Sequence, residues 1–223
     1  MDRKLPLLHA PVLLMIDFQK DFCGQGGYAD QHGGVDWVQE ILPAAVELIT
    51  MARQVDIPII HTREGYAPDL SDCHPAKLAR SQRGGCEIGS QGPLGRLLIR
   101  DEPGHDHIEA LYPSSGELVI DKAGYCAFRN TDLLTQLQAL RVKEILMAGV
   151  TADVCVHTTL RSATENGFIC YYIQDAISTF DRTIRTVCEQ MVEVEGGIWG
   201  HLATVAEIGA LLMSYRHFKL GGN

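Results

Sequence analysis

Short apolar runs alternate with stretches of helical periodicity along most of this chain, and this alternation constrains the fold more than any other feature. The first run, at 12–16, is apolar at every position, which is typical of a strand buried on both faces of a parallel sheet. Further strands are predicted at 57–61, 118–121, 144–149 and 168–173, with a possible sixth at 198–202. Helices are predicted at 36–54, 132–140, 154–166, 181–192 and 204–215. We therefore expect an α/β fold with three layers, α/β/α, around a doubly wound, mainly parallel sheet of five to six strands.

Size and charge limit the classes of protein that fit. The 223 residues correspond to one large domain, so we treat 1–223 as a single unit. The 19 Lys and Arg against 28 Asp and Glu give a net charge of −9, opposite in sign to a surface that binds nucleic acid or anionic membranes. No apolar run approaches the roughly 20 residues that span a bilayer, and the N-terminal segment is too short for a signal sequence. We expect a cytoplasmic protein whose partner is a small molecule.

Some residues indicate where helices begin and end. Plausible N-caps precede three of the helices: Thr131, Asp181 and Thr204. Gly167 is placed to end the helix before it, and Pro43 could mark the true start of the first helix. The segment 63–107 is rich in Gly and Pro and has little periodicity, so we interpret it as a long loop that is either functional or disordered.

Three reactive side chains stand at predicted strand ends. Asp17 ends the first strand, Lys122 ends the third, and Cys155 follows the fourth at the start of a helix. In an open parallel sheet, ligands bind beyond the carboxyl ends of the strands, so these side chains could meet there as acid, base and nucleophile. On spacing alone, an ordinary ion pair between Asp17 and Lys122 explains those two residues equally well.

Cysteine usage makes one thiol stand out. The chain has seven cysteines and no C-x-x-C pair, so neither disulfides nor a zinc site is suggested. Cys155 lies in the first turn of its helix, where the helix dipole and Lys122 are expected to lower the thiol pKa. The other six are interpreted as inert thiols: Cys23, Cys73, Cys86, Cys126, Cys170 and Cys188. His105 and His107 form the only closely spaced histidine pair, which we interpret as solvent-exposed; no metal and no other cofactor is predicted.

Three segments carry a resemblance to a known family. They are MIDFQKDF (15–22), DKAGYCAF followed by NTDL (121–133), and AGVTADVCVHTTLRSATENGF (148–168). They resemble, in order and spacing, the motif blocks of the isochorismatase-like cysteine hydrolases, and the similarity extends from about Val12 to Leu212.

The resemblance implies roles for the strand-end residues. It identifies Cys155 as nucleophile, Asp17 as general base and Lys122 as the third member of a catalytic triad. It also implies a cis peptide between Val150 and Thr151 beside the site, where backbone N–H groups would hold an oxyanion. The family's proteins are commonly dimers or tetramers, so a homo-oligomer is implied.

A finer similarity concerns the substrate. The phrases DFCGQGGYAD (21–30), HTREGYAPDL (61–70) and RSQR (80–83) resemble the biuret-hydrolase branch of ureide amidohydrolases. Within the first phrase, Phe22 and Tyr28 are candidate substrate-binding residues. Glu195 stands where that branch is expected to have a Gln, and it would suit a longer ureide or a cationic group unless it faces solvent. Three arginines could bind a substrate carboxylate or form subunit contacts: Arg63, Arg80 and Arg83.

The sequence therefore favours a cysteine amidohydrolase that cleaves a C–N bond of a small linear ureido or carbamoyl compound and releases ammonia. The alternatives are an N-carbamoyl amino acid or ureidoacrylate amidohydrolase, or a nicotinamidase-like amidase. A zinc nicotinamidase is disfavoured because the residues after the second strand lack the Asp-x-His pattern of those enzymes, and true isochorismatases lack the cysteine. Two alternatives are not enzymes: a binding module, or a thiol redox sensor with Cys126 as the partner of Cys155.

Overall fold

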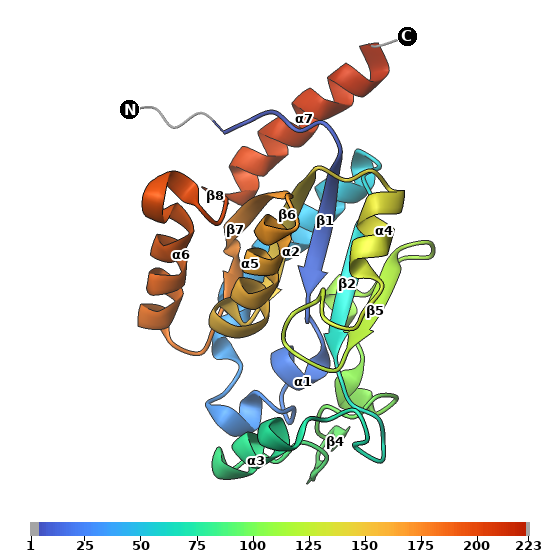
Figure 1. Cartoon of the computed structure of the whole chain (residues 1–223), viewed down its shortest axis with the longest axis vertical. Helices are drawn as coiled ribbons and strands as arrows, with labels where there is room; N and C mark the ends of the chain where they lie inside the picture. The colour runs from blue at the N-terminus through green and yellow to red at the C-terminus, as the bar shows by residue number, and fades with distance from the viewer. Residues whose placement is uncertain (1–4, 222–223) are drawn as a thin grey trace.

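A single parallel sheet of six strands forms the centre of the molecule. The computed structural model describes residues 5–221 and places the strands in the order β5-β2-β1-β6-β7-β8, with every neighbouring pair parallel (Figure 1). The strands are β1 Pro11–Ile16, β2 Ile59–Glu64, β5 Leu118–Lys122, β6 Glu144–Val150, β7 Ile169–Ser178 and β8 His201–Ala203. The predicted α/β class and doubly wound sheet are confirmed.

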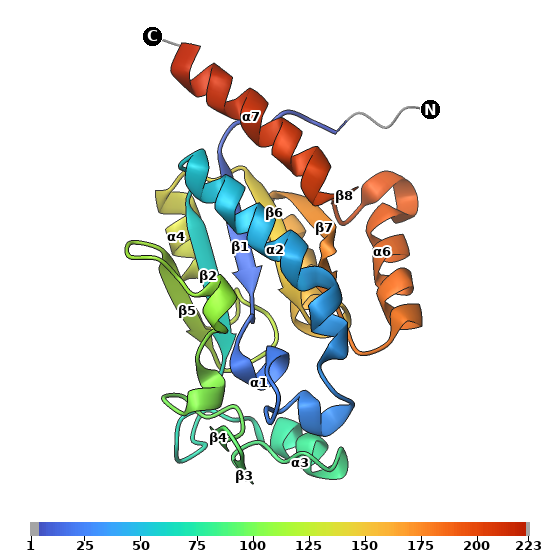
Figure 2. The same ribbon diagram turned by 180° about the vertical axis from the view of Figure 1, so that it is seen from behind.

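Helices cover both faces of the sheet. Figure 1 shows α4 (Leu133–Ala139), α5 (His157–Glu165) and α6 (Arg182–Gly197) on one face, and Figure 2 shows α2 (Asp36–Gln54) and α7 (Val205–Gly221) on the other. Alternate residues of β1 pack into two separate cores, Leu13 toward α2 and Leu14 toward α4 and α5. This explains why the β1 sequence is apolar at every position. No helix within residues 5–221 combines the length and apolar character needed to cross a membrane.

Several predicted boundaries change. Pro43 lies inside α2 instead of at its start, because apolar residues on both sides of it, Ile41 and Ala45, are buried against the sheet. Asp181 caps α6 by accepting hydrogen bonds from two backbone N–H groups, as predicted. The second strand ends at Glu64 and not at residue 61, because residues 62–64 continue the parallel pairing with β5. This extension carries two further charged side chains to the carboxyl edge of the sheet.

The segment 63–107 is ordered, which differs from the long loop that its composition indicates. It contains α3 (Pro75–Arg83), the small hairpin β3 (Gln91–Gly92) and β4 (Gly95–Arg96), and a 3-10 turn at Pro103–His105. Its order comes from packing: Leu97, Leu98 and Ile99 are buried in the same core as α2. With α1 (Lys20–Cys23) it forms a lobe beyond the carboxyl ends of β1 and β2 (Figures 1 and 2). The lobe therefore covers the edge where a ligand would bind.

Candidate active site

The structure places Asp17, Lys122 and Cys155 together at the carboxyl edge of the sheet. Asp17 follows β1 with a positive φ of 55°, Lys122 is the last residue of β5, and Cys155 lies in a π-helical turn, Ala152–Val156, after β6. The Lys122 ammonium Nζ is 2.7 Å from Asp17 Oδ2 and 3.5 Å from Cys155 Sγ. The peptide bond between Val150 and Thr151, just before this turn, is cis.

Lys122 is a fully buried cation held by three acceptors. Besides Asp17 and Cys155, its ammonium donates to the carbonyl oxygen of Gly124 at 2.9 Å. Burial disfavours the charged form, but the negative charges of Asp17 and Glu64 outweigh it and raise the Lys122 pKa. The side chain thus supplies a permanent positive charge between the carboxylate and the thiol.

Asp17 is a completely buried carboxylate with a raised pKa. Its Oδ1 accepts a 2.6 Å hydrogen bond from the Thr62 hydroxyl, while Oδ2 faces Lys122. Complete burial raises the pKa of Asp17 above its ordinary value of 3.8, and Lys122 offsets this only in part. A raised pKa makes the carboxylate a stronger base than an exposed aspartate.

The pKa of the Cys155 thiol differs from the one predicted from the sequence. Burial raises its pKa well above 9.0; Lys122 opposes this, while Asp17 and Glu64 add to it. The predicted net lowering of the thiol pKa is therefore wrong, because desolvation and two nearby carboxylates outweigh the favourable charge of Lys122. The sulfur is a neutral thiol until a base removes its proton.

Glu64 is a site residue that the sequence prediction missed. Its Oε2 is 3.4 Å from Cys155 Sγ, and its Oε1 accepts 2.8 Å hydrogen bonds from Lys77 Nζ and the Tyr66 hydroxyl. Burial would raise the Glu64 pKa, but Lys122 and Lys77 lower it to about 2, so the carboxylate is ionised. The residue was recognisable only if the second strand had been extended to its end, since Thr62 and Glu64 then share one face.

The acidic cluster does not fit a resident metal ion. Ligand atoms of Asp17, Glu64 and Cys155 lie within 4.8 Å of one another, which is close enough for shared coordination. The Lys122 ammonium already lies between them, 2.7 Å from Asp17, 3.5 Å from the sulfur and 3.9 Å from Glu64. We infer that this ammonium supplies the positive charge of the cluster.

A cavity of about 480 Å³ opens onto the Cys155 sulfur. Its walls are largely aromatic, with an acidic base and a basic residue at its rim, and the lining residues are Phe22, Tyr28, His32, Glu64, Arg80, Leu98, Tyr125, Thr151, Val154, Cys155 and Phe180. The volume suits a small substrate. Phe22 and Tyr28, two of the candidate substrate-binding residues, therefore lie at the cavity.

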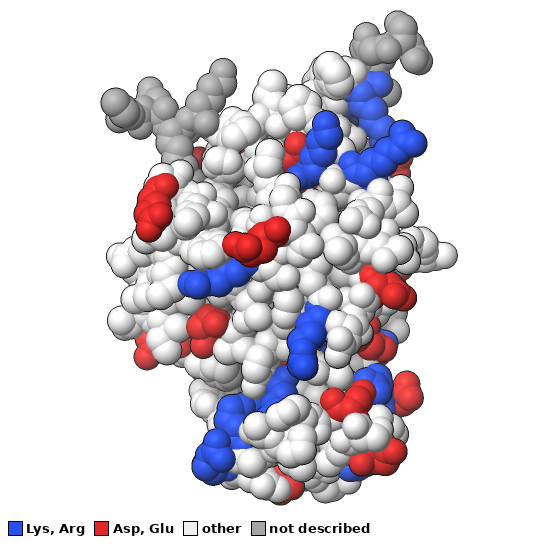
Figure 3. Space-filling view, in the orientation of Figure 1, with Lys and Arg blue, Asp and Glu red and all other residues white. Residues whose placement is uncertain are grey.

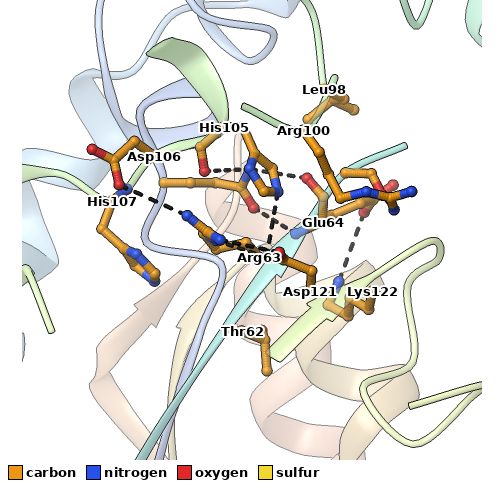
Figure 4. A network of polar contacts seen from close by, with 12 residues as sticks. Thr62, Arg63, Glu64, Leu98, Arg100, His105, Asp106, His107, Asp121 and Lys122 are labelled. Atoms are coloured by element: carbon orange, nitrogen blue, oxygen red, sulfur yellow. Dashed lines mark hydrogen bonds and ion pairs between the residues drawn. The ribbon is translucent and has the colours of Figure 1, made fainter. Parts of the chain in front are cut away.

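Arg63 and Glu195, the other two candidates, lie elsewhere. Successive residues of a strand point to opposite faces, so Arg63 points away from the side that presents Glu64. Its guanidinium pairs with both oxygens of Asp121, at 2.7 and 3.0 Å, and lies 3.8 Å from Asp106 (Figure 4). Glu195 is exposed at a break in α6, with a φ of 52°, and is not among the lining residues. Neither residue is placed to contact a molecule in this cavity.

The interpretation of His105 and His107 as solvent-exposed is wrong. Both rings are only 2% exposed, because the ordered lobe packs over them. Burial lowers their pKa values to about 4 and about 3, so both are neutral. His107 packs against His61 at 5.3 Å between ring centres, and His105 Nε2 is 3.5 Å from Asp121 (Figure 4).

Cys126, the proposed redox partner, does not line the Cys155 cavity. It lines a different hollow, whose lining also includes Cys73, Tyr125 and Arg129. All seven cysteines are free thiols. The redox-sensor alternative therefore gains no support from the site.

Comparison with known proteins gives a family match and similar sequences that carry the name of an amidohydrolase. The isochorismatase domain family matches residues 11–196. Two relatives named ureidoacrylate amidohydrolase RutB, from Yersinia enterocolitica and Enterobacter sp., are each 27% identical. The alignments cover 75% of this chain and 74% of the Yersinia protein, and 72% of this chain and 70% of the Enterobacter protein.

Solved structures agree in fold. A cysteine hydrolase from Pseudomonas syringae has a TM-score of 0.79 at 24% identity, covering 96% of this chain and all (100%) of its own. An N-carbamoylsarcosine amidase from Thermoplasma acidophilum has a TM-score of 0.68 at 18% identity, covering 88% of this chain and 97% of its own. Because the family match spans most of the sequence and includes the three strand ends, this chain belongs to the isochorismatase family.

Proposed function

We propose that this protein is a cysteine-dependent amidohydrolase that cleaves a C–N bond of a small linear ureido or carbamoyl compound and releases ammonia. The observation that carries the proposal is the Cys155 thiol at the cavity, within hydrogen-bonding distance of Lys122 and next to a carboxylate of raised pKa. Relatives named ureidoacrylate amidohydrolase support the ureide class. These names support a ureide substrate in general and do not point to biuret, which is one member of the same substrate class.

In the first half-reaction, Asp17 accepts the thiol proton as the sulfur attacks the substrate carbonyl. Lys122 stabilises the negative charge that develops on sulfur, and the raised pKa of Asp17 favours the transfer. Backbone N–H groups at Thr151 and Cys155 hold the tetrahedral oxyanion. The C–N bond then breaks, and Asp17 returns the proton to the departing nitrogen. Ammonia departs, and the carbonyl carbon stays bound to Cys155 through a thioester-type bond.

In the second half-reaction, water replaces ammonia. Asp17 accepts a proton from the water molecule while the water oxygen attacks the thioester carbon, and a second tetrahedral intermediate forms. The C–S bond breaks, the sulfur takes the proton back from Asp17, and the acid product leaves. Both half-reactions use one carboxylate, one ammonium and one thiol.

Ammonia release from a panel of amides tests this proposal. The panel contains ureidoacrylate, N-carbamoyl amino acids, biuret, triuret and nicotinamide, and each reaction is run with and without chelator. We expect release from at least one ureide by the wild-type protein and by Cys188→Ala, which removes another buried thiol outside the site. Cys155→Ala should lose at least about 10³-fold in kcat while remaining folded.

Two results would count against the proposal. Ammonia release that survives in Cys155→Ala would exclude the thiol as nucleophile. Release that the chelator abolishes would show that a metal, and not the Lys122 ammonium, supplies the positive charge. Mass spectrometry of the wild-type protein quenched during turnover should in addition show the acyl group on the peptide that contains Cys155.

A further inference from the structure

The rim of the cavity is basic although the chain as a whole is acidic. Helix α3 carries Lys77, Arg80 and Arg83 and no acidic residue, while the net charge of the chain is −9. Figure 3 shows basic side chains gathered over α3, at the lower left of the molecule. A local positive region at a cavity mouth raises the local concentration of anionic ligands.

Of these three side chains, Arg80 is the one placed to bind a ligand. Lys77 is already paired with Glu64 at 2.8 Å, and Arg83 is exposed at the end of α3 and does not line the cavity. Arg80 does line it, and no carboxylate among residues 5–221 forms an ion pair with its guanidinium. The guanidinium lies 6.0 Å from the ring centre of Tyr125, and Tyr28 lines the same cavity.

The base of the cavity presents a hydrogen-bond acceptor. Glu64 is ionised and its Oε2 lies 3.4 Å from the Cys155 sulfur, so a substrate carboxylate placed there would meet this carboxylate oxygen instead of a donor. A carbamoyl group, by contrast, brings N–H donors that Glu64 Oε2 can accept. The two ends therefore orient a bipolar substrate in one direction, with its N–H groups inward and its anionic group at the rim.

We propose that the substrate is a small ureido or carbamoyl acid, whose carboxylate binds the Arg80 guanidinium while its terminal carbamoyl group lies against Cys155 and Glu64. This inference rests on the proposed amidohydrolase function and adds to it the charge of the substrate and the residue that recognises it. A guanidinium is well suited to this role because its N–H groups match both oxygens of a carboxylate.

Two substrates of equal length test the proposal: 3-ureidopropionate, which has a carboxylate, and butylurea, which has none. Steady-state kinetics are measured for the wild type, Arg80→Gln, Arg80→Lys and the control Arg83→Gln. We expect Arg80→Gln to raise KM for the acid about 10- to 100-fold, the loss typical of a charge-assisted hydrogen-bonded pair, with little change in kcat. Arg80→Lys should recover part of this loss, and butylurea kinetics should be the same in all four proteins.

Salt gives an independent measurement. The wild-type KM for 3-ureidopropionate should rise between low and high ionic strength, whereas the KM for butylurea should not. The inference is overturned if the wild type hydrolyses both compounds with equal kcat/KM, or if Arg80→Gln impairs both equally, as a structural role would.

Failure of the inference can be separated from failure of the proposed function by calorimetry on Cys155→Ala. Binding of 3-ureidopropionate that is lost in a Cys155→Ala, Arg80→Gln double variant supports the Arg80 site even if no turnover is found. Turnover that depends on Cys155 but shows no preference for the acid leaves the amidohydrolase standing and removes the Arg80 assignment.

Discussion

At the scale of single residues, the site is a buried set of opposing charges around one thiol. Asp17 and Glu64 are matched by Lys122 and Lys77, so the cluster can stay buried with its charges compensated. The three strand-end residues could be predicted from sequence because reactive side chains at the carboxyl ends of apolar strands are conspicuous. Glu64 could not, because nothing in a polar stretch shows that it continues a buried strand.

Glu64 should set the pH at which the site becomes active. Its negative charge raises the pKa of Asp17, so Glu64→Gln should lower that pKa and move the acid limb of the kcat/KM profile to lower pH. The profile of Glu87→Gln, an exposed glutamate in the same lobe, should be unchanged. An unmoved acid limb in Glu64→Gln would contradict this role.

At the scale of elements, prediction succeeds where pattern and burial agree. The strand β1 is apolar throughout and β6 is apolar after its first residue, Glu144, and their predicted ends lie within one residue of those observed. The lobe between β2 and β5 follows no such rule, because its order depends on contacts between residues far apart in sequence. The mistaken interpretation of His105 and His107 and the missed helix α3 share this cause.

Within the lobe, Asp21 joins α1 to the segment 63–107. Its buried carboxylate accepts hydrogen bonds from the backbone N–H groups of Leu98, at 2.9 Å, and Tyr28, at 3.4 Å. Asp21→Ala leaves two buried donors without partners and should lower the free energy of unfolding by about 2–4 kcal/mol, measured by urea denaturation. The exposed Glu109→Ala should change it by less than about 0.5 kcal/mol. Equal effects of the two substitutions would show that the lobe does not depend on this contact.

At the scale of the whole molecule, the sheet carries the reactive side chains and the lobe supplies residues that line the cavity. The cysteine, aspartate and lysine come from the carboxyl edge of the sheet, whereas Phe22, Tyr28 and Arg80 come from segments packed beyond it. Substrate choice can thus change in the lobe while the sheet is retained, which agrees with a shared fold among proteins of different names. The homo-oligomer and the cytoplasmic location stay predictions.

The buried histidines should make the molecule sensitive to mild acid. In the folded protein the pKa values of His105 and His107 are about 4 and about 3, below their ordinary value of 6.5. At a pH between the folded and the ordinary value of each histidine, the unfolded chain therefore binds more protons than the folded protein. The contribution of these two histidines to the free energy of unfolding should therefore fall by a few kcal/mol as the pH drops from about 6.5 toward 4. Asp21 acts in the opposite sense, because burial raises its pKa to about 6 and its protonation favours the folded state.

Urea denaturation at several pH values between 7.5 and 4.5 measures this balance. His107→Phe keeps an aromatic ring against His61 and removes one titrating group, so its stability should depend less steeply on pH than that of the wild type. His9→Phe, at an exposed position, should leave the slope unchanged. If His107→Phe and the wild type show parallel curves, the acid sensitivity arises from other groups, and the depressed pKa of His107 does not govern stability.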